Sequence, residues 1–81
     1  MVFAYILGGV EKGSEMEVLN TLKNSEQIKR ASLIYGAYDF CIEAQFETLE
    51  ELDAFIFNII RKIPGIKDTC TLIVARTFSK E

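Results

Sequence analysis

Histidine is absent from this chain of 81 residues, and cysteine occurs only twice, as Cys41 and Cys70. Zinc and iron–sulfur sites need imidazole or thiolate ligands at short, regular spacings, and these two cysteines lie far apart in the sequence. The sequence also lacks the Asp-rich loop with a central glycine that binds calcium in EF-hands. We therefore expect neither a metal site nor a cofactor.

Long apolar segments are missing as well. The longest runs, near residues 2–7 and 54–60, are far shorter than the roughly 20 residues that a membrane-spanning helix requires. The chain also begins without the basic and apolar regions of a secretory signal peptide. These features predict a cytoplasmic protein that does not contact membranes.

Positive charge is scarce. Nine Lys and Arg residues stand against twelve Asp and Glu, which gives a net charge of −3 and a pI near 4.9. Proteins that bind nucleic acids usually carry a basic patch, but here the basic residues cluster only as the pairs Lys29-Arg30 and Arg61-Lys62. Direct nucleic-acid binding by this chain is not expected.

What the sequence does contain is a regular succession of strand and helix patterns. Apolar runs or strict alternation of apolar and polar residues indicate strands, and apolar residues at three- and four-residue spacings indicate helices. Residues 38–46 alternate most clearly, with Tyr38, Phe40 and Ile42 beginning one face. The expected elements are strands over residues 2–10, 28–35, 38–46 and 67–76, and helices over residues 14–24 and 48–63.

Both expected helices begin with a Ser/Thr-x-x-Glu capping box, formed by Ser14 and Glu17 in the first and by Thr48 and Glu51 in the second. Pro64 ends the second helix. The side chains expected to face the core are Met16, Val18, Leu19 and Leu22 from the first helix, and Leu49, Leu52, Phe55, Ile56, Ile59, Ile60 and Ile63 from the second.

The order of elements, β-α-β-β-α-β, with right-handed crossovers predicts an α+β fold of the ferredoxin-like type. This fold has a four-stranded antiparallel sheet in the order 4-1-3-2, with both helices on one face, and residues 1–81 form a single domain. Cys41 and Cys70 then lie on either side of the first strand, about 10 Å apart and too far for a disulfide.

The predicted sheet has more apolar surface than a monomer needs. Two helices cover only one face, so the strands should alternate between apolar and polar residues. Residues 2–7 are apolar throughout, and so are residues 72–75. We expect a second copy to pack its sheet against this one in a symmetric homodimer. Phe57, which lies off the core stripe, indicates either a further contact between dimers or a partly shielded surface aromatic.

Three local patterns carry a family resemblance: Tyr-Gly-Ala-Tyr-Asp-Phe at residues 35–40, Arg-Lys-Ile-Pro-Gly-Ile at 61–66, and Thr-Cys-Thr-Leu-Ile-Val at 69–74. Together they resemble the C-terminal effector domain of the Lrp/AsnC (feast/famine) transcription regulators, called the RAM domain, over residues 2–76. Because the first strand begins at once, we expect no helix-turn-helix domain. The resemblance implies sheet-to-sheet homodimers, rings of dimers, and an amino-acid effector bound between dimers.

Carried onto this sequence, the resemblance implies effector contacts from Gly36, Tyr38 and Asp39 in the hairpin and from Thr69 and Thr71 in the last strand. A turn glycine admits a ligand close to the backbone, and a carboxylate pairs with an ammonium group. Structural readings exist for each residue. Gly36 also suits a turn that needs a positive φ, Asp39 also bonds turn amides, and threonine is a common strand residue.

The function expected from these observations is effector binding and oligomeric assembly in transcriptional regulation, without DNA binding by the chain itself. One alternative is an assembly partner that joins full-length Lrp/AsnC regulators without sensing a ligand. Another is the ACT-type amino-acid-binding domain, which shares the strand order but which the hairpin and Thr-x-Thr patterns disfavour. A small dimeric α+β-barrel enzyme has the same topology, but a chain without histidine offers no Ser/His or Cys/His pair. We therefore do not expect an enzyme.

Overall fold

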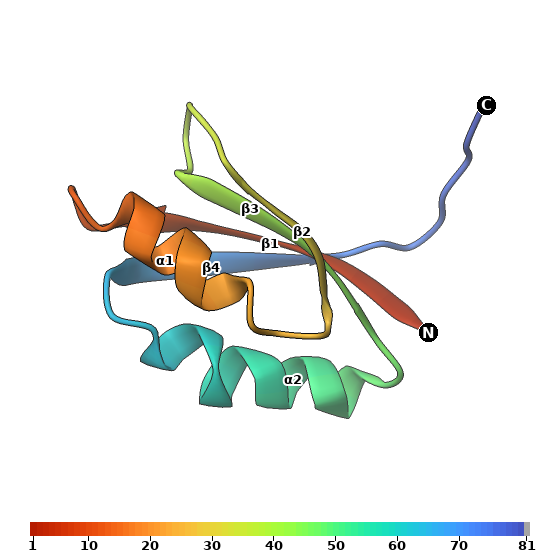
Figure 1. Cartoon of the computed structure of the whole chain (residues 1–81). Helices are drawn as coiled ribbons and strands as arrows, with labels where there is room; N and C mark the ends of the chain where they lie inside the picture. The colour runs from red at the N-terminus through yellow and green to blue at the C-terminus, as the bar shows by residue number, and fades with distance from the viewer. Residues whose placement is uncertain (81) are drawn as a thin grey trace.

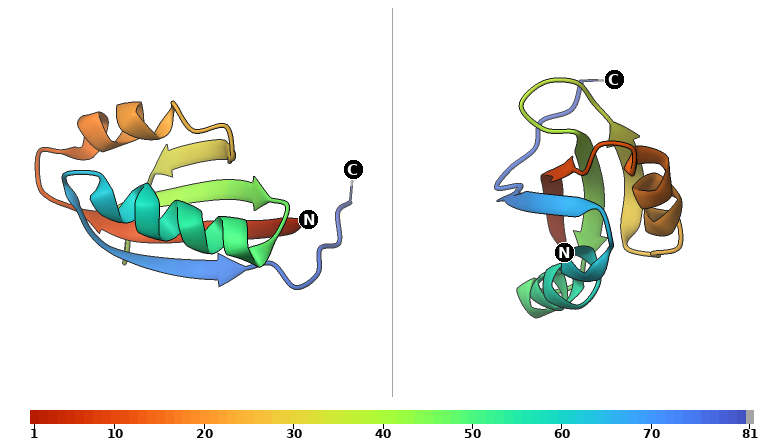
Figure 2. Two further views of the ribbon diagram at one scale, coloured as in Figure 1. Left: turned by 90° about the horizontal axis from the view of Figure 1, so that it is seen from below. Right: turned by 90° about the vertical axis from the view of Figure 1, so that its left-hand side faces the viewer.

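The strands of the chain form one antiparallel sheet with both helices on the same face (Figures 1 and 2). The computed structural model describes residues 1–80. The strand order β2-β3-β1-β4 is the predicted order read from the other edge, so the expected ferredoxin-like fold is confirmed. The elements are β1 (Val2–Val10), α1 (Glu15–Leu22), β2 (Ile28–Leu33), β3 (Phe40–Phe46), α2 (Leu49–Asn58), the short 3-10 helix η1 (Ile60–Lys62) and β4 (Ile66–Ile73).

The core lies between the sheet and the two helices. Alternate residues of β3, from Phe40 to Phe46, are buried as their pattern predicts. The rings of Phe46 and Phe55 pack with their centroids 5.3 Å apart, which ties the end of β3 to α2. The remaining buried side chains are Ala4, Ile6, Val10, Val18, Leu22, Leu52, Ile56, Ile60 and Ile63.

The first helix differs from the prediction at its start. Ser14 occupies the N-cap position, but its side chain makes no capping hydrogen bond; instead, the amide of Gly13 donates to Oε1 of Glu15 at 3.1 Å. Met16, which we expected in the core, is 59% exposed. Because α1 is short, it buries a narrow stripe centred on Val18 and Leu22, and Met16 lies on the other side of the helix.

The second helix confirms its cap but ends early. Oγ1 of Thr48 accepts from the amide of Glu51 at 3.2 Å, as the capping box predicts. The helix stops at Asn58, and η1 continues to Lys62 with a tighter turn. Leu49 and Ile59, expected in the core, are therefore 54% and 41% exposed, since one lies in the first turn and the other at the junction with η1.

The hairpin between β2 and β3 is wider than predicted. β2 ends at Leu33 and β3 starts at Phe40, so Tyr38 lies in the loop and does not continue the buried face of β3. The amide of Asp39 donates to the carbonyl of Gly8 at 2.8 Å, which joins the start of β3 to β1. β4 also ends earlier than expected, at Ile73.

The second face of the sheet carries no helix. Residues paired across antiparallel strands point to the same face, and Leu7 pairs with both Cys41 and Cys70. The surface that we call the open face consists of Phe3, Tyr5, Leu7, Gly9, Cys41, Glu43, Gln45, Asp68, Cys70 and Leu72. Phe3 and Leu72 are 50% and 48% exposed, so the predicted excess of apolar surface is present.

No helix in the part of the chain that the structure describes is long and apolar enough to cross a membrane.

Replacing Gly8 tests how closely the sheet is packed at the hairpin end of β1. A methyl group at this position would overlap the carbonyl oxygen of Asp68 and lie 2.5 Å from Cζ of Phe40. We expect Gly8→Ala to lower the free energy of unfolding by about 1–3 kcal/mol, measured by urea denaturation at fixed protein concentration.

Gly9→Ala is the matched comparison, because its methyl group would crowd no backbone atom and no ring: it would lie 2.7 Å from the Asp68 carboxylate, a side chain that can rotate, and at an ordinary 3.7 Å from that of Asp39. The loss should be smaller. Equal losses in the two variants would contradict the packing assigned to Gly8.

Candidate ligand-binding site

The β2–β3 loop, residues 34–39, is held at its base and open at its tip. The amide of Ile34 donates to the carbonyl of Asp39 at 2.9 Å. Gly36 has a φ of 127°, a conformation that side-chain-bearing residues rarely adopt. No atom lies within 4 Å of the place where its Cβ would be. The turn itself therefore requires glycine, and the tip leaves room beside the backbone.

Two carboxylates converge on the end of β1. Oδ2 of Asp39 accepts from the amide of Val10 at 2.9 Å, and Oδ1 of Asp68 accepts from the amide of Gly9 at the same distance. The register of β1 with β4 shifts between Gly9 and Val10, and this bulge turns both amides toward acceptors outside the regular ladder. Asp39 thus bonds an amide of β1 rather than one of the hairpin turn.

Tyr38 lies over the open face. A hydrogen bond with the Cys70 side chain raises the pKa of the Tyr38 phenol above its ordinary value, and the nearby charges of Cys70 and Asp68 act in the same direction. Cys70 pairs with Leu7 on the open face. Tyr38 therefore connects the hairpin loop to the centre of this face, opposite to the side that Phe40 occupies.

Thr69 and Thr71 point the same way, as their two-residue spacing predicts, but toward the helix side of the sheet. They pair with Gly8 and Ile6, whose side of β1 faces the core. The predicted residues are therefore divided between the two faces, with Tyr38 on one and the threonines on the other.

A cavity of about 420 Å³ opens beside Thr69. Its other lining residues are Arg61 from η1 and Ile66, Lys67 and Asp68 from β4. Arg61 and Lys67 supply positive charge, and Asp68 supplies negative charge. The carboxylate of Asp39 also lies near Gly9. This arrangement suits a small ligand that carries both an anionic and a cationic group.

Sequence reasoning missed Arg61, Lys67 and Asp68 as lining residues of this cavity. Each is an exposed charged residue, a class that is usually solvated and without function. The signal that could have found Asp68 is its pairing with Gly9, because a glycine on one strand leaves space for the carboxylate opposite it. That pairing follows only once the register of β4 is known.

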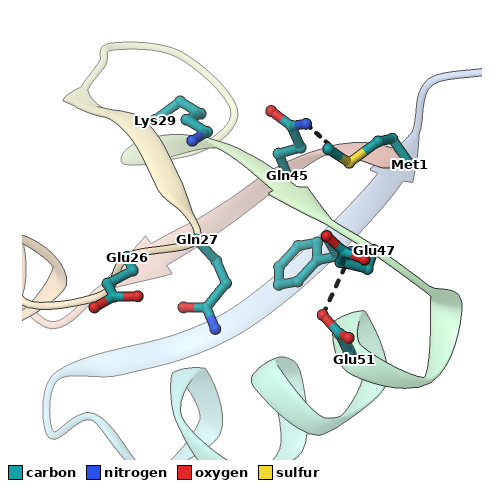
Figure 3. Close-up of a pocket in the computed structure, with 8 residues that line it drawn as sticks. Met1, Glu26, Gln27, Lys29, Gln45, Glu47 and Glu51 are labelled. Carbon is teal, nitrogen blue, oxygen red and sulfur yellow. Dashed lines mark hydrogen bonds between the residues drawn. The ribbon is translucent and has the colours of Figure 1, made fainter.

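A second hollow lies at the opposite end of the sheet (Figure 3). It is lined by Met1, Glu26, Gln27, Lys29, Gln45, Phe46, Glu47 and Glu51. One contact across it is the Gln45 side-chain amide donating to the sulfur of Met1 at 3.0 Å. Its side chains include three carboxylates and one lysine, a balance unsuited to the carboxylate of an amino acid, and the lining contains none of the predicted site residues.

Both cysteines are free thiols on the open face. Partial burial raises the pKa of Cys41, and the charge of Glu43 raises it further. A thiol with a raised pKa is a weak nucleophile at neutral pH. Within residues 1–80, no three potential ligands from His, Cys, Asp and Glu are grouped closely enough to hold a metal ion.

Comparison with known proteins places these features in a family. Residues 4–81 match the sequence model of the Lrp/AsnC ligand binding domain. The HTH-type transcriptional regulator FL11 of Pyrococcus abyssi is 34% identical over 79 residues, which cover 98% of this chain and 52% of FL11. The chain thus spans about half the length of this relative.

Solved structures agree. FFRP-DM1 is 40% identical with a TM-score of 0.88, and the match covers 91% of this chain and 99% of that one. AsnC of E. coli has a TM-score of 0.92 at 22% identity, covering 99% of this chain and 54% of AsnC, which shows a shared fold.

A Neisseria meningitidis transcriptional regulator, solved as a complex with L-Met, has a TM-score of 0.89 at 15% identity, with 98% of this chain and 53% of that one covered. This likeness also concerns the fold alone. The family match and the sequence relatives carry the assignment: the chain belongs to the Lrp/AsnC ligand-binding (RAM) domain family.

Proposed function

We propose that this chain binds a free amino acid at the hairpin end of its sheet and assembles through its open face, acting in transcriptional regulation without contacting DNA itself. The observation that carries the proposal is the pairing of opposite charges around one cavity. Asp68 lines it together with Arg61 and Lys67, and oxygens of Asp39 and Asp68 both lie close to Gly9.

An amino acid in water is a zwitterion, so its site needs an acceptor for the ammonium group and a cation for the carboxylate. Asp39 and Asp68 each have one oxygen assigned to an amide of β1, and both side chains are exposed. Their charge therefore remains available to an ammonium group. Arg61 and Lys67 are the cations nearest to Asp68 within the cavity lining.

The residues predicted from the sequence lie at different places relative to these charged groups. The open tip at Gly36 leaves the loop backbone accessible, and Thr69 lines the same cavity as Arg61. Tyr38 and Thr71 lie at the margins of the site, on opposite faces of β4. We assign ligand contact to Asp39, Asp68 and Thr69 first. A neighbouring dimer that closes the crevice would bring further groups, as the family resemblance implies.

The open face supports assembly. Its aromatic and aliphatic side chains lie on the central strand, where a water-exposed apolar surface is costly. A second copy related by a two-fold axis covers the same residues on both partners. Phe57, which is 54% exposed and stacked under the guanidinium of Arg61 at 4.4 Å, offers a contact for joining dimers into a ring.

The alternative is a module that joins full-length Lrp/AsnC regulators without a ligand of its own. It rests on the same open face and differs only in whether the cavity is filled. Neither role requires DNA binding by this chain, whose net charge is −3.

The ligand site is tested by light scattering and calorimetry with each of the twenty amino acids. We expect one or a few to bind and to change or sharpen the assembly mass. Asp39→Asn keeps an oxygen for the Val10 amide but removes the charge, so it should weaken binding by about 10–100-fold while leaving the dimer intact. Asp53→Asn, an exposed carboxylate on α2, is the matched control and should bind normally.

Two outcomes would contradict the site. Unchanged affinity in Asp39→Asn would show that the ligand binds elsewhere. A fixed mass and no heat with all twenty amino acids would favour the non-sensing assembly partner, with the interface unaffected.

The interface is tested by placing a charge on the open face. Tyr5 is 43% exposed at the centre of β1, and Tyr5→Glu would bury an unpaired carboxylate between two sheets, at a cost of several kcal/mol. We expect a monomer, or a chain that fails to fold, by sedimentation and circular dichroism. Tyr35→Glu, in the loop and 104% exposed, is the control and should remain dimeric. A folded dimer of Tyr5→Glu would refute the interface.

A further inference from the structure

The chain does not end with β4. Residues 74–80, which we call the C-terminal arm, continue past Ile73 and leave the sheet on the side away from α2 (Figure 1). The amide of Val74 donates to the carbonyl of Phe3 at 2.9 Å, which fixes the direction in which the arm departs. Residues 75–80 are all exposed.

The arm and the open face enclose a cavity of about 350 Å³. Phe3 and Tyr5 of β1 contribute aromatic side chains to its lining, and Val74 and Thr77 contribute from the arm. Lys29 and Glu43 are also in the lining, so its formal charges cancel. The remaining lining residues are Ala4 and Ala44. Such a lining suits an apolar group rather than an ion.

Phe78 follows directly after Thr77, which lines this cavity, yet the Phe78 side chain is 86% exposed. The ring is therefore turned away from the cavity of its own chain. A monomer thus leaves two apolar features uncovered, namely an aromatic-lined cavity and a phenylalanine on an extended arm.

We propose that two copies of the chain exchange their arms, with Phe78 of each copy filling the cavity on the open face of the other. This inference rests on the sheet-to-sheet dimer proposed above, because the cavity and the dimer surface share Phe3 and Tyr5. Two-fold symmetry makes the exchange reciprocal, so both cavities and both rings are covered at once.

The charge of the arm is consistent with the arm of a second copy lying on the open face. Arg76 and Lys80 flank Phe78, and the open face carries the carboxylates of Glu43 and Asp68. Glu43 is only loosely paired, with Arg30 at 3.7 Å, and its side chain is 41% exposed. A cation from the partner's arm can therefore share it, although the buried ring supplies most of the contact.

The direct test is NMR on dimers mixed from isotope-labelled and unlabelled chains, in which contacts between copies are distinguished from contacts within one. We expect contacts between the Phe78 ring of one copy and the side chains of Phe3 and Tyr5 of the other. Contacts only within one chain would show that the arm folds back, and no contacts would show that the cavity has another occupant. Either result overturns the proposal.

The energetic test compares Phe78→Ala with Met16→Ala, which removes an exposed apolar side chain from α1, away from the open face. Because each dimer buries two Phe78 rings, Phe78→Ala should raise the monomer–dimer dissociation constant on the order of 100-fold, measured by sedimentation equilibrium. Met16→Ala should leave it unchanged. A Phe78→Ala constant equal to that of the parent also overturns the exchange.

The two proposals fail differently. A parent protein that stays monomeric at every concentration refutes the dimer itself. A dimeric parent that Tyr5→Glu dissociates, but that Phe78→Ala does not weaken, retains the sheet interface and loses only the arm exchange.

Discussion

The central position of β1 is the constraint on which the rest of this structure depends. Because β3 and β4 flank it, β1 must form backbone hydrogen bonds along both of its edges. The side chains on both of its faces must also find partners. One face packs Ala4, Ile6 and Val10 against the helices. The other presents Phe3 and Tyr5, which the described residues leave 50% and 43% exposed. The assembly that we propose would cover this second face, which the described residues leave largely exposed.

The geometry of the proposed ligand site also depends on β1. Where β1 leaves its regular register at Gly9 and Val10, two amides lose their ladder partners, and Asp39 and Asp68 replace them. Gly8 lets Phe40 pack closely beneath, and Gly9 lets the Asp68 carboxylate approach from above. A structural need for acceptors thus places negative charge at the edge of a cavity that also holds Arg61 and Lys67.

Strong local patterns in the sequence predicted the fold well. Features that depend on pairing between distant parts of the chain could not be predicted. The alternation of β3 gave Phe40 to Phe46 correctly because every second residue meets the same core. The Ser14 side chain makes no capping hydrogen bond, and its own amide, which a capping box pairs with Glu17, donates to the carbonyl of Glu11. Tyr38 follows the alternating pattern in the sequence, but β3 begins only at Phe40. The amide of Asp39 donates to the carbonyl of Gly8, and Tyr38 lies in the loop before the strand. Asp68 gave no local signal, because its role comes from the register of β4.

The two proposed activities occupy the same few residues of β1. Leu7, at the centre of the open face, is two positions from Gly9, where the aspartates bind the backbone. Tyr38 extends from the hairpin toward this interval, because the Cys70 side chain that raises the pKa of its phenol is paired with Leu7. A ligand that alters the contacts of Asp39 or Asp68 would therefore act on the strand that also carries the proposed interface. If its affinity differs between free and assembled chains, assembly must shift by the same free energy, because binding and association are linked.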